Sequence, residues 1–79
     1  MTVQVLFFAS LREAANTREL QLSLDAPLNV RNLATRIERD YKGLELSGSL
    51  CAINEHYVDP DTLINEGDTI AFFPPVSGG

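Results

Sequence analysis

The sequence predicts an α+β fold in which one mixed β-sheet is covered by one main helix. Residues 2–9 and 18–24 alternate between apolar and polar side chains, which is typical of half-buried strands. Residues 30–41 instead repeat apolar side chains at helical spacing. Residues 50–53 and 69–73 are short apolar runs bounded by turn residues, as strands often are. Strands on either side of a single long helix favour two packed layers.

Size and charge limit the kind of protein this can be. The chain has 79 residues, of which 44% are hydrophobic, so we expect one globular domain with a small core. Six basic and eleven acidic residues give a net charge of −5 without any basic run, so nucleic acid is not an expected partner. No apolar stretch is long enough for a bilayer and no signal peptide is apparent, so no membrane association is expected. One cysteine cannot form an internal disulfide, and a reducing cytoplasm is the expected location.

The first strand pattern, residues 2–9, leads into a short predicted helix. One face of the strand is expected to point into the core: Val3, Val5 and Phe7. Leu6 and Phe8 then lie on the outer face, where apolar residues are unusual. Ser10 and Glu13 have the spacing of a capping box, so Ser10 is the expected N-cap of a helix of one or two turns.

The second strand pattern is expected to pair antiparallel with the first. Its leucines share one face: Leu20, Leu22 and Leu24. The main helix is expected to start after Asn29, a residue that favours the N-cap position. Its apolar positions also share one face: Val30, Leu33, Ala34, Ile37 and Tyr41. Gly43 is the expected C-terminal stop of this helix.

Beyond the main helix, a connector leads to the short strands of the C-terminal half. His56 is expected in the turn that follows residues 50–53. Leu63 and Ile64 are expected to pack onto the core from a loop. Gly67 can adopt the positive φ of a tight turn just before the last strand.

The last residues, 72–79, read Phe-Phe-Pro-Pro-Val-Ser-Gly-Gly and form the most unusual stretch of the chain. The two prolines lack an N–H and have a fixed φ, so they should end the last strand and start a stiff spacer. The two terminal glycines have no side chains and can enter a channel that any Cβ would block. From Pro75 the extended chain can reach about 17 Å, at roughly 3.3–3.6 Å per residue. We therefore divide the chain into a domain, residues 1–73, and an extended tail, residues 74–79.

The residues before this tail offer no catalytic set. One histidine and one cysteine cannot form a zinc cluster, and no glycine-rich phosphate loop or nucleophile–base pair is present. His56 is interpreted as a solvated turn residue and Cys51 as a small buried hydrophobe. The terminal carboxylate is therefore the group expected to take part in chemistry, after activation by another enzyme.

An apolar patch is expected on the outer sheet face if the first and last strands are neighbours. Its members are Leu6, Phe8, Ala71 and Phe73. Patches of this kind often mark protein interfaces. A register error of one residue would instead place these side chains in the core. We favour an interface because the patch lies where the tail begins.

The residue patterns at the two ends resemble the small, sulfur-carrier subunit family of molybdopterin synthase. Residues 72–79 closely match the end of that family. Val5–Ala9, followed by Leu-Arg-Glu at 11–13, is similar to its first strand and turn, and Glu66–Asp68 fits before its last strand. The resemblance covers nearly the whole chain. It implies the ubiquitin-like β-grasp fold, with the first and last strands adjacent and parallel.

The resemblance also implies a function, in which the chain is not an enzyme on its own and binds no cofactor itself. Gly79 would be adenylated by an adenylyltransferase of the ubiquitin-activating type, which uses ATP and magnesium. A sulfurtransferase or cysteine desulfurase system would then convert it to a thiocarboxylate. The large, catalytic subunit would receive the tail and convert cyclic pyranopterin monophosphate into molybdopterin, within a heterotetramer. The residues implied in partner binding are Phe8, Arg12, Phe73, Pro74, Pro75, Val76, Ser77 and Gly78.

Three alternatives stay open. Arg12 has an equally good interpretation as a surface residue of the short helix. A carrier for thiazole synthesis or RNA thiolation shares the fold and the Gly-Gly end but usually lacks the Phe-Phe-Pro-Pro run. A ubiquitin-like modifier joined to lysines, or a plain interaction module, belongs to a different functional class.

Overall fold

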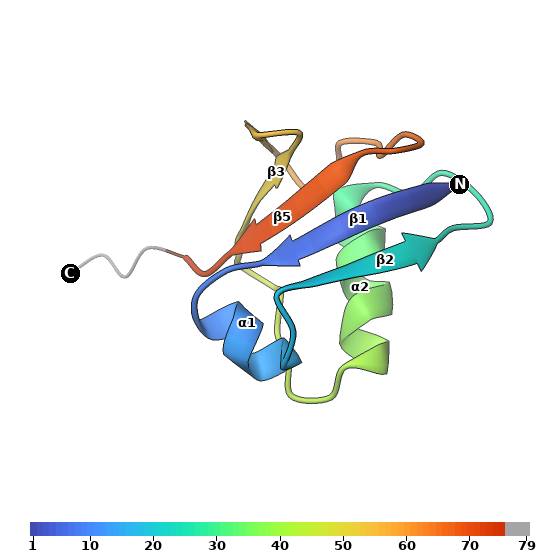
Figure 1. The fold of residues 1–79 in the computed structure, drawn as a ribbon. Helices are drawn as coiled ribbons and strands as arrows, with labels where there is room; N and C mark the ends of the chain where they lie inside the picture. The colour runs from blue at the N-terminus through green and yellow to red at the C-terminus, as the bar shows by residue number, and fades with distance from the viewer. Residues whose placement is uncertain (76–79) are drawn as a thin grey trace.

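The computed structural model describes residues 1–75, and the predictions for Val76, Ser77, Gly78 and Gly79 lie outside the described residues. Within residues 1–75, two helices and five strands follow one another along the chain (Figure 1). Their bounds are Thr2–Phe7 for β1, Ser10–Ala15 for α1, Glu19–Ser23 for β2, Val30–Asp40 for α2, Leu50–Ile53 for β3, His56–Val58 for β4 and Thr69–Phe73 for β5.

The strands form one mixed sheet in the order β2-β1-β5-β3-β4. β1 and β5 pair in parallel, whereas the other neighbouring strands are antiparallel. α2 packs against one face of this sheet, and no helix of the described chain covers the opposite face (Figure 1). The first and last strands are thus central neighbours, which confirms the predicted β-grasp fold.

The core lies between α2 and the sheet. Val3, Val5 and Phe7 of β1 are at most 1% exposed, as their alternation predicts. Parallel register places Ile70 and Phe72 of β5 directly opposite Val5 and Phe7. The rings of Phe7 and Phe72 have centroids 6.3 Å apart. Removing this apolar surface from water is the main driving force for the packing of β1, β5 and α2.

The main helix begins where the sequence predicts. The Oδ1 atom of Asn29 accepts a hydrogen bond from the Asn32 N–H at 2.8 Å, which satisfies a free donor of the first turn. The buried residues of α2 itself are Val30, Leu33 and Ile37. The prediction that Gly43 stops the helix is wrong. Tyr41 leaves the helical region first, with ψ 88°, so α2 ends at Asp40 and Gly43 adopts φ 91° in the following turn.

The predicted capping box at the start of α1 is also wrong. The N-cap is Ala9, with φ 53° and ψ −128°, and no side chain caps the helix. A tight turn, closed by the Leu11 N–H bond to the Phe8 C=O at 3.1 Å, already reverses the chain at Ala9. Ser10 is therefore the first helical residue, and β1 ends at Phe7 rather than at Ala9.

Two further predictions change in the C-terminal half. The turn after β3 consists of Asn54 and Glu55, with φ 50° and 72°, so His56 is the first residue of β4 and not a turn residue. Ile64 is fully buried, as predicted, but Leu63 is 64% exposed. Successive side chains of an extended segment point to opposite sides, so only one of this pair can reach the core.

Candidate functional site

The uncovered face of the sheet carries a row of small and apolar side chains. Leu6 of β1 lies opposite Ala71 of β5. Ala71 in turn lies opposite Ala52 of β3, and Ala52 lies opposite Tyr57 of β4. Opposite residues of paired strands share a face, so this row crosses four strands. We call the surface the outer patch, and its residues are Leu6, Phe8, Leu50, Ala52, Tyr57, Ala71 and Phe73.

Aromatic rings stand above the alanine floor of the outer patch. Phe8 and Phe73 are stacked, with ring centroids 4.6 Å apart and an interplanar angle of 16°. Tyr57 is tilted against Phe73 at a centroid distance of 5.9 Å and is 72% exposed. A hollow of about 440 Å³ lies over the row and is bordered by Phe8 and Phe73. Aromatic anchors and pockets dominate binding at protein interfaces, so this hollow is a candidate docking site.

The opposite rim of this hollow is polar. The Asn54 side chain accepts a hydrogen bond from the Thr69 N–H at 3.0 Å and donates one to the Asp68 carboxylate at 2.9 Å. These bonds fix the turn that presents Glu55 at the same rim. The outer patch therefore has an apolar centre and a polar, acidic edge, an anatomy typical of protein interfaces.

The structure brings together the patch residues that the sequence predicts. They share the outer face: Leu6, Phe8, Ala71 and Phe73. The alternative of a one-residue register error is therefore wrong, while the role of these residues in partner binding stays a prediction. Leu50, Ala52 and Tyr57 were not among the residues predicted for this patch. For all three, the available signal was alternation with the core-facing Cys51 and Ile53, together with the two-residue turn that connects the strands.

The described chain ends beside the outer patch. Phe73 is the last residue of β5, and Pro74 and Pro75 follow it outside the sheet. The terminal glycines, predicted as the reactive end, lie outside the described residues. Consecutive Cα atoms are about 3.8 Å apart, so a protein bound to the patch is within reach of the C-terminus.

Arg12 lies on the exposed surface of α1 and makes no ion pair within residues 1–75. Its backbone C=O accepts hydrogen bonds from the Asn16 and Thr17 N–H groups at the helix end. The guanidinium is thus available to a partner, and a docking role for Arg12 stays a prediction.

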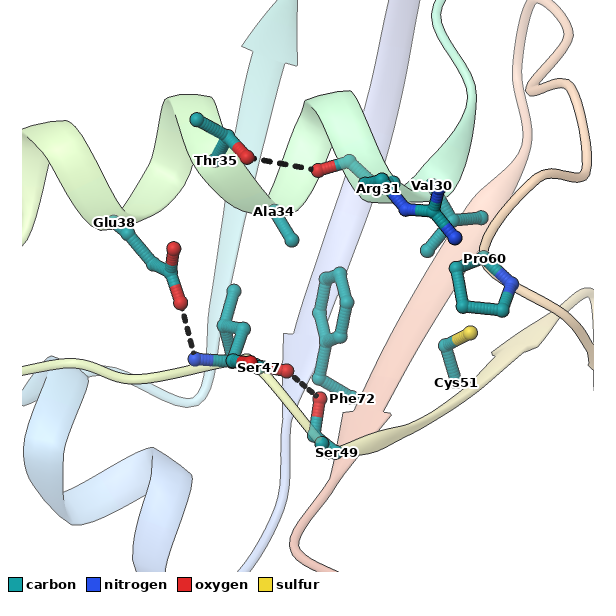
Figure 2. A pocket seen from close by; sticks show the side chains of 12 residues that line it. Val30, Arg31, Ala34, Thr35, Glu38, Ser47, Ser49, Cys51, Pro60 and Phe72 are labelled. Carbon is teal, nitrogen blue, oxygen red and sulfur yellow. Dashed lines mark hydrogen bonds between the residues drawn. The ribbon is translucent and has the colours of Figure 1, made fainter.

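A second hollow, of about 320 Å³, lies between α2 and the connector before β3 (Figure 2). Its polar groups are already engaged. The Glu38 carboxylate accepts from the Leu46 N–H at 2.6 Å, and the Ser49 hydroxyl donates to the Leu46 C=O at 2.6 Å. Arg31 pairs with Asp61 at 3.0 Å. The Glu38 contact fastens the connector to α2, the Ser49 contact closes the connector on itself, and the Arg31 contact joins α2 to the loop after β4. These contacts favour a structural role for the hollow.

Cys51 lines the same hollow (Figure 2). Its thiol donates to the Val58 C=O at 3.3 Å, and the residue is 6% exposed. Burial first, and the Asp59 carboxylate second, raise the pKa of the thiol above its ordinary value of 9.0. Cys51 is therefore a protonated, poorly nucleophilic thiol at neutral pH, consistent with its interpretation as a small buried hydrophobe.

The remaining candidate ligand groups, the histidine and the carboxylates, form no cluster within residues 1–75. His56 lies with its Nδ1 3.0 Å from the Asn54 C=O. Among residues 1–75, no group of three or more His, Cys, Asp or Glu is placed to hold a metal ion. No helix in that range has the length and apolar character needed to cross a membrane.

Comparison with known proteins identifies the family. The sequence matches the model described as the ThiS family over residues 5–79. The chain belongs to the ThiS family. This ThiS-family chain is 36% identical to the molybdopterin synthase sulfur carrier subunit of Escherichia coli strain K12, over 98% of this chain and 99% of that protein. The relation predicted from the two end motifs is thereby confirmed.

Solved structures also resemble this ThiS-family chain. A chain in the protein–protein complex of subunits 1 and 2 of molybdopterin-converting factor from Helicobacter pylori 26695 matches it with a TM-score of 0.69 and 28% identity, over 100% of both chains. The small archaeal modifier protein 1 of Methanosarcina acetivorans matches with a TM-score of 0.76 and 31% identity, over 99% of this chain and 96% of that chain. The same fold thus occurs in proteins named as subunits of molybdopterin-converting factor and as modifiers.

Proposed function

We propose that this chain is the sulfur-carrier subunit of a molybdopterin synthase. The observation that carries the proposal is the outer patch immediately before a Gly-Gly end, in a chain that aligns over nearly its whole length with a named carrier subunit. The patch holds the domain on a partner while the last residues enter the partner's active site. The partner supplies the acid–base groups, and the carrier supplies positioning and delivery.

The first proposed step activates the Gly79 carboxylate. An ionised carboxylate spreads its charge over two oxygens and resists nucleophiles, so it needs a better leaving group. It attacks the α-phosphate of ATP in an adenylyltransferase partner, with magnesium, and pyrophosphate leaves. The persulfide of a sulfurtransferase or cysteine desulfurase system then attacks the acyl carbon, and the new C–S bond replaces the C–O bond to AMP. A thiol of that system breaks the S–S bond of the resulting acyl disulfide, so that the donor is left as a disulfide and Gly79 becomes a thiocarboxylate.

The second proposed step delivers this sulfur. The carrier docks on the larger subunit, and the thiocarboxylate sulfur attacks a carbon of cyclic pyranopterin monophosphate. The new C–S bond replaces a C–O bond of that carbon, whose oxygen leaves as phosphate ester or as water, and two such transfers complete the dithiolene. Hydrolysis of the carrier's C–S bond leaves sulfur on the pterin and returns the carboxylate. Docking makes the attack effectively intramolecular, which lowers its entropic barrier. The named complex of subunits 1 and 2 from Helicobacter pylori supports such docking, and we propose a heterotetramer with two carriers at the ends of a large-subunit dimer.

A protein-modifier function is the second candidate, because the chain is 31% identical to a small archaeal modifier protein. An adenylated Gly79 would then be attacked by a lysine amine, and an isopeptide bond would form. Carriers for thiazole synthesis or RNA thiolation would load sulfur in the same way but deliver it to another acceptor.

Intact-mass analysis of the chain isolated from cells tests the proposal. We expect a species whose mass has increased by the exchange of one oxygen for one sulfur, located at Gly79 by fragmentation. The matched control carries one alanine after Gly79. This leaves the domain unchanged and converts the glycyl carboxylate into a peptide bond. We expect this control to remain unmodified and to give no active molybdoenzymes in cells that lack their own carrier. Isopeptide products without sulfur exchange support the modifier instead, and normal molybdoenzyme activity from the alanine-extended chain refutes the carrier.

A further inference from the structure

A third hollow lies away from the outer patch, between α2 and the loop that follows β2. It has a volume of about 400 Å³. Its principal lining residues are Leu24, Asp25 and Leu28 from the loop and Asn32, Arg36 and Arg39 from α2. The three helix residues are spaced by four and three positions, so they form one stripe along α2. Leu24 is 2% exposed and Leu28 is half-buried, so the floor is apolar.

The charge of this hollow is opposite to that of the whole chain. Arg36 and Arg39 make no ion pair within residues 1–75, and Asp25 is the single carboxylate among the lining residues. The chain as a whole carries a net charge of −5. Two guanidinium groups against one carboxylate therefore create a local positive site, which selects acidic partners by charge complementarity.

β2, which leads into this loop, is an edge strand of the sheet (Figure 1). The Phe7 N–H bonds to the Arg18 C=O at 2.9 Å, so alternate residues from Arg18 onward face β1. The residues between them direct their N–H and C=O groups to the open edge: Glu19, Gln21 and Ser23. The Thr17 hydroxyl accordingly reaches the Glu19 C=O at 2.9 Å, whereas Gln21 and Ser23 remain available to another strand.

The two edges of the sheet differ in their protection. β4, at the other edge, has three residues and is followed directly by Asp59 and Pro60. Short length and proline are devices that prevent strand addition. β2 is longer and contains neither a proline nor a charged residue after Glu19. The sheet is therefore open to strand addition at β2, next to the positive hollow.

We propose that the β2 edge and this hollow together bind an extended, acidic peptide segment of a partner protein. The segment adds a strand to the sheet through the backbone groups of Gln21 and Ser23. Its acidic side chains pair with Arg36 and Arg39, and an apolar side chain fills the floor at Leu24. The surface lies apart from the outer patch, so this inference does not depend on the proposed sulfur-carrier function.

The probe is a capped nonapeptide with glutamate at positions 3 and 5, valine at position 7 and threonine elsewhere, so that these three side chains share one face of an added strand. The matched valine–lysine peptide has lysine in place of both glutamates. Backbone amide NMR shifts of the full chain are the readout. We expect saturable shifts at β2 and at Arg36 and Arg39, with an affinity that falls as salt is added. Several outcomes overturn the proposal: shifts confined to the outer patch, equal binding of a valine–lysine peptide, or no saturable binding. The proposal is also overturned if inorganic phosphate shifts the two arginines and the peptide causes the same shifts without any at β2. Concentration-dependent shifts at β2 without peptide indicate that a second copy occupies the edge, and these also overturn it.

Charge variants make this test specific. The double variant Arg36→Glu/Arg39→Glu should bind the glutamate peptide about fivefold more weakly, the size expected for two surface ion pairs, and should now prefer the lysine peptide. Asp25→Asn should strengthen binding of the glutamate peptide, and Lys42→Glu, the matched control outside the hollow, should leave it unchanged.

Gln21→Pro removes an outward N–H at a position where an edge strand tolerates proline, and it should weaken binding without unfolding the sheet. Equal loss with Lys42→Glu, or unchanged binding to the arginine double variant, contradicts the proposal.

Discussion

Ala9 is a residue whose backbone is unfavourable for its side chain. It combines φ 53° with ψ −128° at the first central position of a tight turn, a conformation that glycine adopts readily. Such strain costs about 1–3 kcal/mol. We therefore expect Ala9→Gly to raise the free energy of unfolding by about 1 kcal/mol, after subtracting the greater entropy of the unfolded glycine chain. The urea midpoint should rise with an unchanged slope. Ala14→Gly, on the exposed side of α1, is the matched control and should lower stability by about 0.5–1 kcal/mol; an equal loss in both variants contradicts the strain.

Cys51 makes the stability of the domain sensitive to alkaline pH. Its pKa in the folded state is raised above the ordinary value of 9.0. Below that value both states carry a neutral thiol, and the contribution to stability is complete. As the pH rises beyond 9.0, the unfolded thiol ionises first, so the free energy of unfolding falls until the folded pKa is reached.

This prediction is checked with urea midpoints of wild type and Cys51→Ala at about pH 7 and about pH 10. Alanine lowers stability at both pH values because it leaves a cavity. The informative quantity is the change between them, which should be smaller in Cys51→Ala. An equal change in both proteins shows that other groups cause the alkaline loss.

At the scale of elements, the periodicity of apolar residues was sufficient to predict a helix or strand wherever that element buries one face. Alternation located β1 and β2, and the apolar stripe located α2, because side-chain direction repeats within each element. The errors occur at the ends of elements. A tight turn at Ala9 starts α1 without a side-chain cap, and a two-residue turn before His56 places that residue in β4. Tyr57 joins the outer patch because β4 pairs with β3.

The N-terminus of α2 allows a test of a single element. We expect Asn29→Ala to lower the free energy of unfolding by about 1 kcal/mol, because the Asn32 N–H loses its acceptor. Asn29→Asp keeps an acceptor oxygen in the same place and should retain most of the stability. Thermal and urea unfolding followed by circular dichroism measure both variants. A loss with aspartate as large as that with alanine indicates that packing of Asn29, and not capping, is the cause.

At the scale of the whole molecule, the candidate site was predictable in part. The apolar outer faces of β1 and β5 were visible in the sequence, but their adjacency came from a family resemblance, since strand order is a tertiary property. In the structure, parallel pairing places Leu6 beside Ala71, and the stacked rings of Phe8 and Phe73 continue this contact. The chain's two end segments thus build one surface. This explains why the motifs that identify the family lie at both ends of the sequence.

That arrangement predicts that docking and sulfur chemistry can be separated by mutation. Phe8→Ala/Phe73→Ala removes the stacked pair of the outer patch and leaves the terminal glycines intact. We expect its affinity for the purified large subunit to fall at least about tenfold, since buried aromatic anchors dominate interfaces. Leu63→Ala, an exposed leucine outside the patch, is the matched control and should bind normally. Titration calorimetry gives the affinities, and circular dichroism verifies folding.

The alanine-extended chain separates docking from sulfur transfer. It retains the outer patch, so it should compete with wild type for the large subunit while transferring no sulfur to the pterin. Adding excess alanine-extended chain to a synthase assay should therefore inhibit, and the same chain carrying Phe8→Ala/Phe73→Ala should not. Inhibition that survives loss of the two rings shows that the tail alone binds the partner. In that case the outer patch is not the docking surface, whatever the terminal glycine carries.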